Sequence, residues 1–96
     1  SYKKAVYPPI SILEKSHKLL SIVNKIYRKI GDNCMSDLGV SIEMASASIN
    51  GAVMNVNINL KEISDKNFIN DVNKKVTKLS KDVDNYLFRL NKDIEL

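Results

Sequence analysis

The sequence lacks tryptophan and holds only one cysteine, one histidine, two prolines and three glycines among its 96 residues. The single thiol, Cys34, excludes an internal disulfide, and no cysteine or histidine pair has the spacing of a zinc site. Every apolar run is shorter than the roughly eighteen residues that cross a bilayer, and no signal-peptide core follows the basic start. We therefore expect a cytoplasmic protein with no membrane contact and no bound metal.

Motifs of catalysis are missing as well. His17 and Cys34 are isolated from each other, and the sequence has neither a glycine-rich phosphate loop nor a nucleophile elbow. His17 lies at the edge of an apolar stripe, where a surface histidine is commoner than a base or a ligand. Asp82 and Asp84, two residues apart, would point to different sides of a helix. The sequence predicts no enzyme activity, no catalytic residue and no cofactor.

Helical periodicity is what the sequence does contain. Between Ile69 and Leu90, apolar side chains recur at alternating three- and four-residue steps, and lysines occupy the opposite side. The apolar positions are Ile69, Val72, Val76, Leu79, Val83, Tyr86 and Leu90. Two earlier segments repeat the pattern. We predict an all-α fold, an antiparallel up-down bundle with helices over about residues 10–30, 37–62 and 66–91.

Turn-forming residues divide the chain between these helices. Gly31-Asp32-Asn33 follows the first apolar stripe, and Ser64 or Asp65 supplies an N-cap for the third helix. Pro8-Pro9 stiffens a basic, aromatic start, with a proline at the first helical position. We expect an extended lead-in over residues 1–9, followed by a single helical domain over residues 10–96.

The second helix carries one dissenting signal. Val56 to Leu60 alternates β-branched or apolar residues with asparagine, which would also suit a strand. A lone strand has no partner within this chain, so the helical interpretation is favoured. Its apolar positions are Leu38, Ile42, Ala45, Ile49, Ala52, Val56 and Leu60.

The net charge of +4 is unevenly distributed. Residues 1–31 carry seven basic side chains against Glu14, and residues 32–65 carry Lys61 against five acidic ones. A basic helix surface can contact phosphates without reading base sequence. The candidates for nucleic-acid contact are Lys15, Lys18, Lys25, Arg28 and Lys29 on the first helix, and Lys74, Lys78, Lys81, Arg89 and Lys92 on the third.

A series of short stretches also suggests a family. They are LEKSHKLL from Leu13, Ile26-Tyr27, LGVSIEMASASI from Leu38, Val56-Asn57 and VTKLSKDVDNYLFRL from Val76. In this order they resemble the small four-helix-bundle family of diversity-generating retroelement accessory proteins and of proteins encoded in 23S ribosomal RNA intervening sequences. The resemblance implies a homopentamer that binds RNA or DNA and a reverse transcriptase. No fourth helix is evident, so a second copy or a partner would supply it.

Two functional hypotheses follow. The first is a non-catalytic, oligomeric, basic helical protein that binds nucleic acid without sequence preference, as an accessory to a reverse transcriptase. The second is a helical protein-interaction module, such as an adaptor, a secretion chaperone or an antitoxin-like partner, whose apolar seam completes a bundle with another chain. Under the second hypothesis the lysines only keep the surface soluble.

Overall fold

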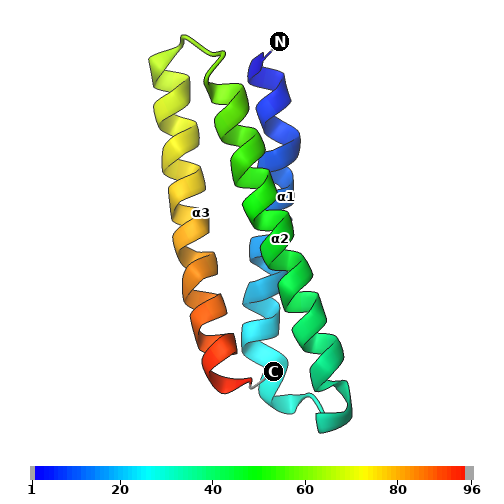
Figure 1. The fold of residues 1–96 in the computed structure, drawn as a ribbon. Coiled ribbons are helices and arrows are strands. Elements are labelled where there is room, and N and C mark those ends of the chain that lie inside the picture. The colour runs from blue at the N-terminus through cyan, green and yellow to red at the C-terminus, as the bar shows by residue number, and fades with distance from the viewer. Residues whose placement is uncertain (1, 95–96) are drawn as a thin grey trace.

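Three long helices build the protein, and the computed structural model describes residues 2–94 (Figure 1). The helices are α1 (Tyr2–Ile26), α2 (Met35–Leu60) and α3 (Lys66–Asp93), with two short 3₁₀ turns at Tyr27–Lys29 and Asp32–Cys34. No strand occurs between residues 2 and 94. The predicted all-α class is confirmed. The last two residues of the predicted domain, 95 and 96, lie outside the described part.

The helices run side by side with α2 antiparallel to α1 and α3 (Figure 1). The molecule is a narrow rod of 50 × 17 × 16 Å. Helix α1 packs against both neighbours, whereas α2 and α3 contact each other much less. Because α1 supplies most of the contacts, it is the helix on which the other two are positioned.

The core is aliphatic, as a chain with so few aromatic residues requires. All seven predicted apolar positions of α2 are buried. The largest fully buried side chains in the described residues are Leu13, Leu20, Leu90, Val6, Val56 and Val83. Burying each such side chain stabilises the fold by roughly 1.5–3 kcal/mol relative to leaving it in water.

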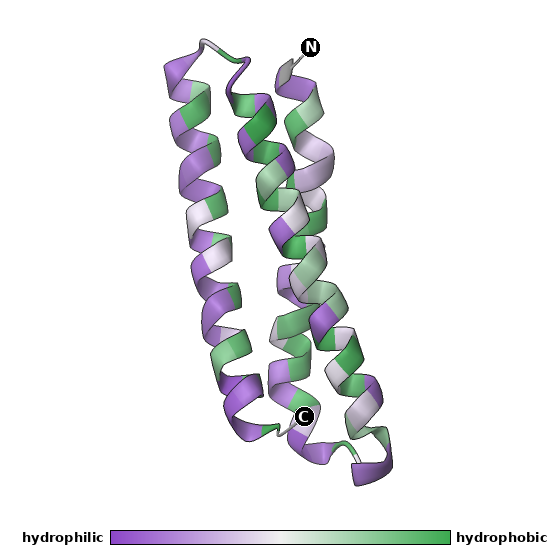
Figure 2. Ribbon diagram, viewed as in Figure 1, coloured by the Kyte–Doolittle hydropathy of each residue, from purple (hydrophilic) through white to green (hydrophobic). Residues whose placement is uncertain are grey.

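Helix α3 follows the predicted pattern closely. Asp65 caps it, since its side chain accepts a hydrogen bond from the backbone N–H of Phe68 at 3.1 Å. Val72, Val76 and Val83 are buried against the other helices. Figure 2 shows α3 as predominantly hydrophilic along most of its length, whereas α2 is hydrophobic around much of its visible surface. Helix α3 is therefore an outer helix with one buried seam.

The prediction of an extended lead-in over residues 1–9 is wrong. Helix α1 begins at Tyr2 and includes Pro8 and Pro9. A proline inside a helix costs about 3 kcal/mol because it removes a hydrogen bond and crowds the preceding turn. Here Val6, Pro9 and Ile10 are buried in the core, and their burial offsets that cost.

The end of the first helix and the segment from Val56 to Leu60 in the second helix can now be compared with the sequence predictions. Helix α1 ends at Ile26, and the predicted last turn to residue 30 is replaced by a 3₁₀ turn. Val56 to Leu60 is helical, because Val56 and Leu60, four residues apart, share the core-facing side of α2. Within the described residues, no helix is both long enough and apolar enough to span a membrane.

Candidate functional site

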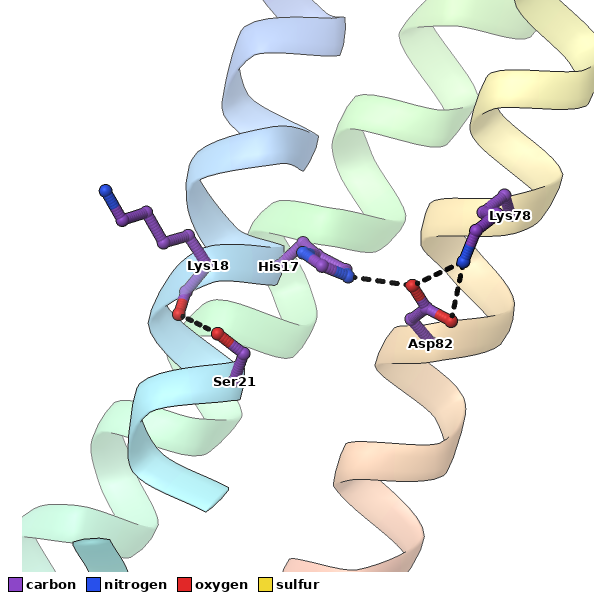
Figure 3. Close-up of polar contacts among 5 residues, drawn as sticks. All are labelled: His17, Lys18, Ser21, Lys78 and Asp82. Carbon is purple, nitrogen blue, oxygen red and sulfur yellow. Dashed lines mark hydrogen bonds and ion pairs between the residues drawn. The ribbon is translucent and has the colours of Figure 1, made fainter. Parts of the chain in front are cut away.

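His17 joins α1 to α3 through a cluster of polar side chains (Figure 3). Its Nε2 lies 3.0 Å from Oδ2 of Asp82. Lys78, one turn before Asp82 on α3, places its Nζ 3.2 Å and 3.4 Å from the two carboxylate oxygens. Asp82 is thus held between a cation and an imidazole, with His17 turned toward α3.

The electrostatics of the cluster favour an ionised Asp82. The hydrogen bond from His17, and after it the hydrogen bond from Lys78, holds the pKa of the Asp82 carboxyl below its ordinary value of 3.8. A carboxylate only accepts hydrogen bonds, so Nε2 of His17 must carry a hydrogen. That leaves Nδ1 as the ring atom that can take up or release a proton.

Tyr86 packs against the imidazole, and Asn24 contacts the backbone of Tyr86. The ring of Tyr86 meets the ring of His17 edge to face, with centroids 5.6 Å apart and an interplanar angle of 62°. Asn24 donates a hydrogen bond from Nδ2 to the backbone carbonyl of Tyr86 at 3.4 Å. The His17 side chain keeps 23% of its surface exposed, so the ring is held in place and still reachable from solvent. Such a group can act in proton transfer.

A second polar cluster lies at the C-terminal end of α3. The hydroxyl of Tyr27 donates a hydrogen bond to Asp93, and Arg28 approaches the same carboxylate at 3.3 Å. The hydrogen bond between Tyr27 and Asp93 raises the pKa of Tyr27 and lowers the pKa of Asp93. These contacts link the last turn of α3 to the 3₁₀ turn Tyr27–Lys29 that follows α1, so their role is structural.

The ten basic residues predicted to contact nucleic acid are all exposed. Two of them bind carboxylates of α3, since Lys78 pairs with Asp82 and Arg28 pairs with Asp93. Figure 3 shows Lys18 extending away from α3 while Lys78 turns to Asp82. The structure does not gather these two lysines on one surface.

Sequence reasoning missed the partners of His17. Asp82 is 65 residues away in the chain, and only the packing of α3 parallel to α1 brings the two side chains together. The expectation that Asp82 and Asp84 face different sides agrees with the structure, where Asp82 is half-buried and Asp84 is exposed. The one feature of the sequence that pointed to this pairing is the position of Asp82, which lies next to the apolar seam of α3. No group of three or more metal-binding side chains occurs within residues 2–94.

The stability of the Asp82 cluster is expected to depend on pH. A carboxyl whose pKa is lower in the folded state stabilises the fold above its unfolded pKa, and this contribution is lost as pH falls through the folded pKa. We predict that Asp82→Asn lowers the melting temperature by a few degrees at pH 7, and that the gap to wild type closes on acidification below about pH 4. Thermal unfolding followed by circular dichroism measures both.

A matched control for this prediction is Asp84→Asn, two residues along the same helix and exposed. It is expected to change the melting temperature much less at pH 7. A difference between Asp82→Asn and wild type that stays constant from neutral to acidic pH would contradict the role assigned to the carboxylate.

Comparison with known proteins gives two matches. The family described as formiminotransferase-cyclodeaminase matches residues 1–78. A formimidoyltransferase-cyclodeaminase from Gallus gallus is 36% identical over 77 residues, which is 80% of this chain and 14% of that protein. The chain therefore spans about one seventh of the length of this relative. No solved structure matches significantly.

These matches overturn several predictions. The resemblance to retroelement accessory and intervening-sequence proteins is wrong, because the matching family is a different one. The matches also overturn the predicted nucleic-acid-binding function, and with it the reverse transcriptase partner and the pentamer that the resemblance implied. The prediction of no enzyme activity is also contradicted, because the matching family and the matching relative are named for an enzyme. Short motifs in helical repeats misled the assignment, since many bundles share the same spacing of apolar and small residues.

Proposed function

The chain belongs to the formiminotransferase-cyclodeaminase family. We propose that it functions in an enzyme of this kind and takes part in the cyclodeaminase reaction. The observation that carries the proposal is the family match over residues 1–78, which spans α1, α2 and the first half of α3. The relative is named for two activities, formimidoyl transfer and cyclodeamination. We assign cyclodeamination because its proton requirement suits the one histidine cluster of the described residues.

Cyclodeamination of a formimidoyl group has a defined atom balance. A neighbouring amine nitrogen bonds to the formimidoyl carbon, and the bond from that carbon to its terminal nitrogen breaks. The formimidoyl group reacts in its protonated amidinium form, whose terminal nitrogen carries two hydrogens. The attacking nitrogen loses a proton and the leaving nitrogen gains one, so ammonia departs, the ring-closed product keeps the positive charge, and neither water nor an oxidant is consumed. The demand on the protein is a group that donates a proton near neutral pH.

His17 is the residue we propose for this proton transfer. Nε2–H of His17 donates to Asp82, which leaves Nδ1 as the ring nitrogen that can exchange a proton with a substrate. Asp82 would act as a positioning residue, since it orients the ring, and Lys78 would hold Asp82 in turn. Tyr86 limits rotation of the ring from the other side.

Release of ammonia tests the proposal. The purified protein is incubated with a formimidoyl compound that carries a second amine two carbons away, so that ring closure gives a five-membered ring. We expect ammonia to appear in multiple turnovers, measured by a coupled dehydrogenase assay. Ammonia release no faster than in a protein-free control would contradict the proposal. A cytoplasmic location and self-association remain predictions.

A further inference from the structure

The two interfaces that α1 makes differ in their chemistry. Among the side chains of residues 3–94, every polar contact between helices joins α1, or the 3₁₀ turn after it, to α3 or its N-cap residue. In the same residues no hydrogen bond or ion pair of a side chain joins α2 to α1 or to α3. The α1–α2 interface is therefore held by apolar packing alone, whereas α3 is attached by apolar packing and by polar contacts.

Four carboxylates take part in the contacts that attach α3, and they are spread along the whole rod. Each forms a side-chain pair across the interface, and we call these pairs the α1–α3 bridges. They are Lys3 with Asp65 at 2.8 Å, Glu14 with Lys75 at 3.3 Å, His17 with Asp82 at 3.0 Å, and Arg28 with Asp93 at 3.3 Å. The four carboxylate side chains keep between 31 and 49% of their surface exposed, so protons from the solvent reach every bridge.

Acid changes the charge of the three helices unequally. Residues 1–31 and residues 66–96 carry seven basic side chains each, whereas α2 carries none and has only Asp37 and Glu43 as charged residues. Carboxylates lose their charge on acidification, while lysine and arginine keep theirs. Acid therefore leaves α1 and α3 as two cationic helices packed side by side, and it leaves α2 neutral. The resulting repulsion acts between α1 and α3 and spares the α1–α2 interface.

The aspartates of the bridges prefer their ionised form in the folded protein. Hydrogen bonds from Lys3, His17 and Tyr27, in that order, are the main reason why the pKa of Asp65, Asp82 and Asp93 lies below its ordinary value. The groups that face the four carboxylates are Lys3 for Asp65, Lys75 for Glu14, His17 and Lys78 for Asp82, and Tyr27, Arg28 and Lys92 for Asp93. A carboxylate with a lowered pKa stabilises the fold above its unfolded pKa, and this contribution is lost as pH falls through the folded pKa. The aspartate bridges are therefore lost in acid.

From these observations we infer that acid releases α3 as a unit from the α1–α2 pair, before that pair itself unfolds. Loss of the α1–α3 bridges and repulsion between the two cationic helices drive the release, and the non-helical residues 61–65 form the hinge. Helix α2 holds α3 back little, because the two contact each other much less than either contacts α1. Release separates His17 from Asp82, so the polar cluster of these residues exists only while α3 is attached. The inference concerns the fold and does not rest on the proposed enzyme role.

Hydrogen exchange resolved by mass spectrometry tests the release. The exchange rate of each peptide is divided by the rate of an unfolded chain at the same pH, which gives its protection. Between pH 7 and pH 3 the protection of α3 peptides should fall at least about tenfold more than that of α1 and α2 peptides, and it should return at pH 7. Loss of protection in all three helices together, or α3 peptides that stay protected at pH 3, would overturn the inference.

Neutralising the bridges should reproduce the effect of acid at pH 7. The triple variant Glu14→Gln, Asp82→Asn, Asp93→Asn removes three of the four carboxylates and keeps Asp65 as the N-cap of α3. Its α3 peptides should lose protection at pH 7 while its α1 and α2 peptides stay as protected as in the wild type. Protection unchanged in α3, or lost equally in all three helices, would contradict the role of the bridges.

A second triple variant is the matched control for charge. Glu43→Gln, Asp71→Asn, Asp84→Asn also removes three negative charges, but these side chains are exposed and form no ion pair among residues 3–94. Its α3 peptides should lose far less protection at pH 7 than those of the bridge variant. Equal losses in the two variants would show that net charge alone, and not the α1–α3 bridges, holds α3 in place, which would overturn the inference.

Discussion

Leu20→Ala is expected to lower the free energy of unfolding by about 2–5 kcal/mol. Leu20 is 1% exposed in the second half of α1, where it contributes to the core shared with the other helices. Removing three carbon atoms there loses apolar burial and leaves a cavity that the rod can only partly close. For a domain of this size, with a total stability of about 5–14 kcal/mol, the loss is a large fraction. Urea denaturation followed by circular dichroism gives the value.

The neighbouring residue provides the control for this change. Leu19 carries the same side chain on the same helix but is 48% exposed. Leu19→Ala is expected to change the free energy of unfolding by less than about 1 kcal/mol, since much of its surface already meets water. Equal losses for the two variants would show that α1 does not face the core as described.

His17→Gln is expected to slow ammonia release by about 10²–10⁴-fold, the usual contribution of a proton-transferring side chain. Glutamine can still donate a hydrogen bond to Asp82, but it has no group that titrates near neutral pH. The fold should therefore survive while proton transfer is lost. Steady-state rates of ammonia release, measured for both proteins over a pH series, give the size of the effect.

Lys18→Gln is the matched control for the histidine change. Lys18 follows His17 in the chain but extends away from α3 (Figure 3). Its replacement should leave the rate and the pH profile as in the wild type. If His17→Gln also stays within a factor of about two of the wild-type rate, the imidazole is not the proton donor. That result would leave the family membership of the chain intact.

Hydrophobic periodicity predicted most of the fold. The seam of α3 and the core positions of α2 could be read directly, because each helix alternates buried and exposed sides at the helical period. The start of α1 could not be predicted. Local rules for Pro8 and Pro9 favour an extended segment, and only the tertiary burial of Val6 and Ile10 reverses that preference.

The candidate site was much less predictable than the fold. Its two central residues, His17 and Asp82, come from different helices, and their pairing depends on how α1 and α3 align along the rod. The lysines were predicted as a site instead, because the charge of a residue can be read from the sequence whereas its neighbours in the fold cannot.

The measurement that tests the proposed reaction most directly is the fate of the terminal formimidoyl nitrogen. A substrate labelled with nitrogen-15 at that atom is converted by the purified protein, and ammonia and product are analysed by mass spectrometry. Cyclodeamination predicts labelled ammonia and an unlabelled ring-closed product in a one-to-one ratio. Label retained in the product, or labelled ammonia accompanied by an open-chain formyl compound, would contradict it.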